Sequence, residues 1–138
     1  MGLTPEQMDK MIDEHFGYEC RDDVEGVLKT LTDDARHDIV GFPTGPTRGR
    51  EGARDFYQTM FADLSDSKVT NIKRLYGENF LVDESFWEGK APGQPFGFNG
   101  KGRPLSFRLL HVIEFSEAGD IASEQVWCDM LAIANQLQ

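Results

Sequence analysis

The sequence has few cysteines and contains no long apolar run. Its two cysteines, Cys20 and Cys128, are far apart and form no CxxC or Cys/His ligand pattern. We therefore expect neither a disulfide framework nor a metal site, and a reduced cytoplasmic setting. The N-terminal residues lack an apolar signal segment, and no stretch is apolar enough for a membrane span. We expect no contact with a membrane.

Basic side chains are also scarce. The chain carries 14 Lys and Arg against 24 Asp and Glu, so its formal net charge is 14 − 24 = −10. Binding of nucleic acid needs a basic surface, which excludes nucleic acid as the main partner. The sequence also lacks a G-x-S-x-G nucleophile motif, a phosphate-binding loop and zinc-ligand spacing. The charge leaves binding of small molecules open.

Large apolar rings are abundant: ten Phe, three Tyr and two Trp among 138 residues. This length and composition predict a single domain over residues 1–138 with one substantial core. Helical spacing of apolar residues predicts helices from Pro5, from Asp22 and over 50–64. Strands are predicted over 35–42, 68–76, 80–88, 105–115 and 121–130, and the Gly- and Pro-rich segment 91–104 is predicted to be irregular. The order ααβαββββ indicates an α+β fold.

The last two predicted strands form a hairpin around the turn at 116–120. If Phe115 faces Ile121 and the pairing stays regular, His111 lies opposite Gln125, and Phe107 lies opposite Asp129. Alternate side chains share a face, so one face then carries aromatic rings together with a histidine, an amide and a carboxylate. This mixture is typical of a ligand cavity with a few polar groups.

Three segments resemble a known superfamily. The Asp33–Asp38 run and the segment 48–57 look like the nuclear-transport-factor-2-like, ketosteroid-isomerase-like fold. The ending Trp127-Cys128-Asp129-Met130-Leu131, followed by Gln136-Leu137, is similar to the tail of SnoaL-like polyketide cyclases. The resemblance implies a cone, in which a strongly curved antiparallel sheet wraps around N-terminal helices and encloses an apolar pocket. It also implies a homodimer through the outer sheet face and chemistry without a metal or organic cofactor.

The resemblance suggests catalytic residues as well. In the cyclases an aspartate acts as general acid/base in an intramolecular aldol ring closure, with a histidine nearby. Asp129 matches that aspartate, and His111 on the preceding strand would share its pocket. The isomerases carry their base near the position of Asp38. Because adjacent strand residues point to opposite faces, only one of His37 and Asp38 faces the pocket, and we favour His37.

Seven further residues are candidates for substrate contact. The two tryptophans suit stacking on a planar ligand, although ordinary core or interface roles are open for them. For the two rings on the third helix we favour a core role, with contact to the pocket wall as a by-product. These seven are Trp87, Trp127, Gln125, Tyr57, Phe61, Phe107 and Leu109.

The sequence therefore predicts a cofactor-free SnoaL-like cyclase, or a related isomerase or lyase, acting on an apolar carbonyl compound. The alternative is a non-catalytic protein that binds a small hydrophobic metabolite. Epoxide hydrolysis would require an arginine between two pocket aspartates. Arg108 is predicted on the opposite face, which disfavours that reaction.

Overall fold

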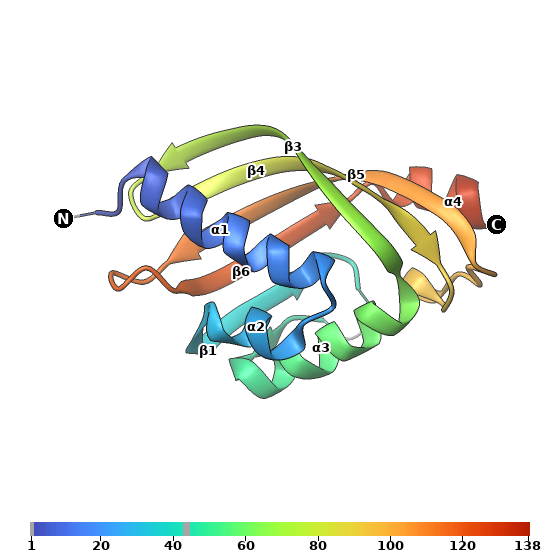
Figure 1. The fold of residues 1–138 in the computed structure, drawn as a ribbon, viewed down its shortest axis with the longest axis horizontal. Helices are drawn as coiled ribbons and strands as arrows, with labels where there is room; N and C mark the ends of the chain where they lie inside the picture. The colour runs from blue at the N-terminus through green and yellow to red at the C-terminus, as the bar shows by residue number, and fades with distance from the viewer. Residues whose placement is uncertain (1, 43–44) are drawn as a thin grey trace.

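The computed structural model describes residues 2–42 and 45–138, which form an α+β fold (Figure 1). Two helices precede the first strand, a third helix follows a short second strand, and four long strands lead to a C-terminal helix. The elements are α1 (Pro5–Cys20), α2 (Val24–Lys29), β1 (Leu31–Ile39), β2 (Thr47–Arg48), α3 (Gly49–Asp63), β3 (Ser65–Gly77), β4 (Phe80–Ala91), η1 (Pro95–Gly97), β5 (Arg103–Phe115), β6 (Ile121–Cys128) and α4 (Met130–Leu137).

The predicted order ααβαββββ is confirmed, with β2, η1 and α4 as additions, and η1 is a short turn of helix within the segment 91–104 that was predicted to be irregular. The final strand is shorter than the predicted 121–130, because the side chain of Asp129 accepts a hydrogen bond from the Ala132 backbone nitrogen (3.1 Å) and begins α4. The start of α1 follows the sequence closely. Thr4 accepts a bond from the Gln7 backbone, and the Gln7 side chain accepts one from the Thr4 backbone, which completes a capping box.

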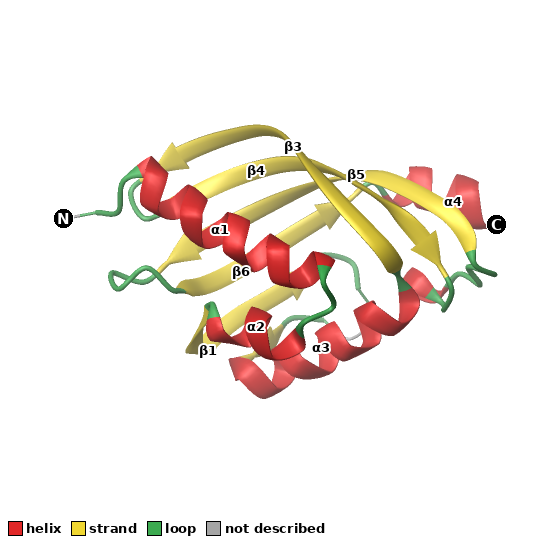
Figure 2. Cartoon of the chain, in the orientation of Figure 1, coloured by secondary structure: helices red, strands yellow, loops and turns green. Residues whose placement is uncertain are grey.

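The sheet is mixed, curved and not closed into a barrel. Its strand order is β2-β1-β6-β5-β4-β3, and every pair is antiparallel except β1 with β6. The expected antiparallel sheet therefore has one parallel pair, because β6, the last strand of the β3–β6 meander, runs in the same direction as its other neighbour, β1. Helix α1 lies across the sheet, while α2 and α3 lie beside β1 (Figure 2).

The β5–β6 hairpin contains the feature that decides which side chains face inward. Phe115 pairs with Ile121 as predicted, but Glu114 pairs with Ser123, so Ala122 is an extra residue on β6. Beyond this bulge His111 pairs with Val126 and not with Gln125. A shift of one residue turns every following side chain to the other face. The predicted pairing of His111 with Gln125 is therefore wrong.

The inner face of the sheet packs against the helices. Buried apolar side chains of α1, α2 and α3 contact Leu81 of β4 and Ile113 of β5, both fully buried, and a second cluster packs α4 against Leu105 and Phe107. Among the described residues, no helix is both long enough and apolar enough to cross a membrane.

Candidate functional site

An apolar cavity of about 90 Å³ lies between the helices and the inner face of the sheet. Most of its lining is aromatic or aliphatic, including Phe16 from α1, Phe56 from α3 and Trp87 from β4. Phe96 of η1 borders it with a backbone φ of 54°, a left-handed conformation that is uncommon for a bulky residue. A few polar side chains also reach the cavity. They include Glu19, His37, Tyr57, His111 and Glu124.

Six of the residues predicted for the site lie in this lining: His37, His111, Trp87, Tyr57, Phe107 and Leu109. Phe61 packs beside Tyr57, with ring centroids 5.8 Å apart, and belongs to the core around the cavity. The structure therefore brings both candidate histidines to one cavity from strands far apart in the sequence.

Four other predicted residues lie outside the cavity. Asp129, expected to be the buried general base, is exposed and caps α4. Trp127 is 41% exposed. Gln125 shares the outer face with it, and Asp38 pairs with Arg36 at 3.2 Å. The prediction that Asp129, Trp127 and Gln125 point inward is wrong, because the bulge at Ala122 reverses the faces of β6. For Asp38 the reason is strand alternation, since His37 takes the inward position.

His111 is held by a carboxylate that the sequence analysis did not single out. Its Nδ1 lies 3.2 Å from Asp83 Oδ1, and the two residues are paired across β5 and β4. Burial would raise the pKa of Asp83, but hydrogen bonds from His111, Arg74 and Ser85 outweigh it and lower the pKa to about 2. Asp83 is therefore an ionised acceptor, and His111 Nδ1 carries the hydrogen of this bond.

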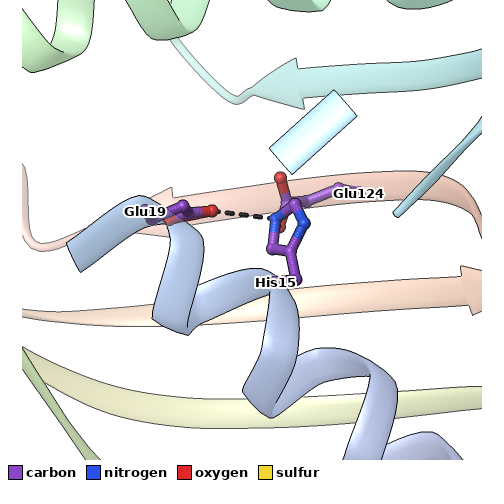
Figure 3. A group of neighbouring side chains, drawn as sticks. All are labelled: His15, Glu19 and Glu124. Atoms are coloured by element: carbon purple, nitrogen blue, oxygen red, sulfur yellow. Dashed lines mark hydrogen bonds and ion pairs between the residues drawn. The ribbon is translucent and has the colours of Figure 1, made fainter. Parts of the chain in front are cut away.

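The second polar group joins side chains of α1, α3, β1 and β6, most of which line the cavity, and we call it the polar end of the cavity. Figure 3 shows three of its members, His15, Glu19 and Glu124. His15 Nε2 stands 2.8 Å from Glu19 and 3.1 Å from Glu124. Tyr57 donates to Glu124 at 2.8 Å, and His37 Nε2 lies 3.1 Å from the same carboxylate. One buried carboxylate on β6 thus binds groups from three other elements.

Electrostatics inside this group are strongly perturbed. Burial would lower the pKa of His15, but Glu124 and Glu19 raise it to about 10. Burial would raise the pKa of Glu124, yet His15 and the hydrogen bond from His37 hold it well below its usual range. Burial and the same two carboxylates raise the pKa of Tyr57 well above its usual value. At neutral pH the group therefore contains an ionised Glu124 and a neutral Tyr57 hydroxyl.

Two other possible chemistries find little support. Both cysteines line the cavity, but burial raises the pKa of the Cys128 thiol to about 12, and burial together with Glu19 raises that of Cys20. Neither thiol is activated as a nucleophile. Arg108 lies outside and pairs with Glu84, as its predicted face requires. The arginine that does contact Asp83, Arg74, reaches toward α1 and is not part of the cavity lining.

The sequence assigned no functional role to four polar residues of this region: His15, which fits the apolar face of the first helix as a core or pocket-rim histidine, and Glu19, Asp83 and Glu124. One signal was available, because His15 and Glu19 stand four residues apart on a predicted helix and so share its face. Asp83 and Glu124 depend on strand pairing. The inward orientation of Glu124 in particular follows from the bulge, which the hydrophobic pattern does not mark.

The chain is similar to many solved structures, among them the following three. A proposed SnoaL-like polyketide cyclase from Jannaschia sp. CCS1 has a TM-score of 0.84 at 15% identity, with 99% of this chain and 96% of that chain covered. TsrD from Streptomyces laurentii has a TM-score of 0.83 at 19% identity, covering 98% and 97%. SalBIII, an epoxide hydrolase/cyclase-like enzyme in salinomycin pyran ring formation, has a TM-score of 0.77 at 15% identity, covering 92% and 94%.

These likenesses at low identity establish the fold. No curated protein matches the sequence. A family model described as SnoaL-like polyketide cyclase matches residues 7–137. The chain therefore belongs to the SnoaL-like polyketide cyclase family.

Proposed function

We propose that this protein is a cyclase, or a related isomerase or lyase, that moves a proton on an apolar carbonyl compound with His111 as general base. The observation that carries the proposal is the pair formed by Asp83 and His111 in the wall of the apolar cavity. No metal or organic cofactor is needed for a proton transfer of this kind.

The pair has the arrangement that a histidine base requires. Since Nδ1 carries the hydrogen bonded to Asp83, the other ring nitrogen, Nε2, is the one that holds the lone pair in the neutral ring. None of the described residues forms a hydrogen bond with Nε2. The ring of Phe16 packs beside the imidazole, with centroids 4.7 Å apart. Asp83 thus fixes the tautomer, while the apolar wall fixes the ring.

The cavity also supports an orientation for the substrate. Its apolar walls, with Trp87 and Phe107 stacked 5.2 Å apart, suit a ring system. Its polar end holds His37, Tyr57 and Glu124. A carbonyl compound bound with its oxygen toward that end would present a neighbouring carbon to β5, on which His111 lies.

A homodimer through the outer sheet face is part of this proposal. Leu110 and Trp127 are paired across β5 and β6, and their exposed fractions are 37% and 41%. Leu75 on β3 is 54% exposed. Adjacent exposed apolar side chains of this kind mark interaction surfaces, and a second copy of the sheet would cover them.

The experiment uses 1-tetralone, a bicyclic ketone with exchangeable hydrogens beside its carbonyl. The protein is incubated with it in D₂O near neutral pH, and deuterium incorporation at that carbon is followed by NMR. We expect protein-dependent exchange that falls about 100-fold or more in His111→Gln. Asp129→Asn, which keeps an amide able to cap α4, is the matched control and should retain the wild-type rate.

Two outcomes would contradict the proposal. Exchange at an equal rate in His111→Gln would exclude His111 as the base. Saturable binding of the ketone by the wild type without any exchange would instead support the alternative, a binding protein for a small hydrophobic metabolite.

A further inference from the structure

We propose that His15, Glu19 and Glu124 form a binding site for one divalent first-row transition-metal ion at the polar end of the cavity. The inference departs from the sequence-based expectation of no metal site and does not rest on the proposed function. Among the residues described, these three are the group of His, Cys, Asp and Glu whose ligand atoms all lie within 4.8 Å of one another.

The spacing of the ligand atoms fits such an ion. His15 Nε2 lies 2.8 Å from Glu19 Oε1 and 3.1 Å from Glu124 Oε2 (Figure 3). Ligands at about 2.1 Å from a metal ion in octahedral geometry stand about 3.0 Å apart. Both distances from His15 Nε2 therefore match those between neighbouring ligands of one ion, and all three ligand atoms lie within 4.8 Å of one another.

The orientation of His15 is the second observation. The Thr30 hydroxyl donates its hydrogen to the Val27 carbonyl at 2.6 Å, so it can only accept from His15 Nδ1, which lies 2.7 Å away. Metal-binding histidines are typically held in this way, with the second ring nitrogen donating to a fixed acceptor and Nε2 directed at the ion.

Glu124 is fixed in the same manner. Its Oε1 accepts from Tyr57 at 2.8 Å and lies 3.1 Å from His37 Nε2. Its Oε2 is the atom that faces His15. The two oxygens are thus divided, one for the supporting hydrogen bonds and one for the ligand position.

Charge provides the third observation. Glu124 is 2% exposed, and the side chain of Glu19 is 17% exposed. Over residues 2–42 and 45–138, neither carboxylate forms an ion pair with a lysine or an arginine. The His15 ring is the cation that faces both carboxylates in the metal-free protein, and a divalent ion bound in exchange for its Nε2 proton would bring more positive charge to the same two carboxylates.

The ligand set limits the class of ion. One imidazole nitrogen with two carboxylate oxygens suits Zn²⁺, Mn²⁺ or Fe²⁺, whereas Mg²⁺ and Ca²⁺ prefer sites made of oxygen alone. Glu19 and Glu124 both line the cavity, which leaves a coordination position open on the cavity side. A water molecule or a ligand oxygen would occupy it.

The test measures binding and not turnover. The full chain, freed of metal by a chelator that is then removed, is titrated with Zn²⁺ and separately with Mn²⁺ by calorimetry. We expect one ion per chain for at least one of the two. Glu19→Gln should weaken binding about 100-fold, and Glu14→Gln, an exposed position on the same helix, should bind like the wild type.

Thr30→Val provides a variant outside the ligands. It removes the acceptor for His15 Nδ1 and should weaken binding about 10-fold. Circular dichroism checks that each variant is folded. Absence of saturable binding of either ion by the wild type would overturn the proposal, as would equal binding by Glu19→Gln and Glu14→Gln. These results are independent of the exchange assay with 1-tetralone.

Discussion

Replacing Asp83 by Asn tests the Asp83–His111 pair through stability and needs no substrate. The pKa of Asp83 falls from 3.8 to about 2 in the folded protein. Each unit of difference in pKa between the folded and unfolded protein corresponds to about 1.4 kcal/mol. The lowered pKa of Asp83 therefore means that its ionised carboxylate contributes about 2 kcal/mol to the free energy of unfolding. Because the pKa is depressed by folding, this contribution is complete above pH 5 and is lost as the pH falls through 3.8 toward 2.

The assay is urea unfolding between pH 2.5 and 6.5, followed by fluorescence of Trp87 and Trp127. The wild type should exceed Asp83→Asn by at least 2 kcal/mol at pH 6, and the difference should shrink by about 2 kcal/mol at the acid end. Asp38→Asn makes the same change on the outer face of the sheet and measures the effect of removing any strand carboxylate. A difference between wild type and Asp83→Asn that stays constant with pH would refute the reasoning.

Three further predictions concern other parts of the fold. Asp129→Ala removes the cap of α4 and should lower the free energy of unfolding by about 1 kcal/mol, measured in urea, without changing ligand affinity. Trp127→Glu places a charge on the proposed dimer surface and should yield monomers in sedimentation velocity; a monomeric wild type would contradict this. Ile113→Ala opens a cavity at a fully buried position and should cost about 2–4 kcal/mol, whereas a loss below 1 kcal/mol would show a loosely packed core.

The fold could be predicted from the sequence because its signals are local. The capping box at Thr4, the helical stripe of α3 and the turn at 116–120 each depend on residues close together in the chain. The family resemblance added the overall architecture. None of these required knowledge of how distant strands pair.

The site depended on such pairing and was predicted only in part. His37 and His111 were placed correctly, since alternation along one strand fixes them. On β6 the bulge at Ala122 changed the outcome, so that Glu124 faces inward and Asp129 faces water. A bulge of one residue alters the hydrophobic periodicity of a strand too little to be recognised from the sequence.

The hydrogen bonds of Glu124 have a consequence for how substrate preference could diversify on this scaffold. They fasten α1, α3 and β1 to β6, so a substitution there disturbs several elements together. Phe42 and Phe96 also line the cavity and meet edge to face, with centroids 6.1 Å apart, but they take no part in those hydrogen bonds. New ligand shapes are therefore accommodated at least cost by exchanging these two rings, while the network around Glu124 stays as it is.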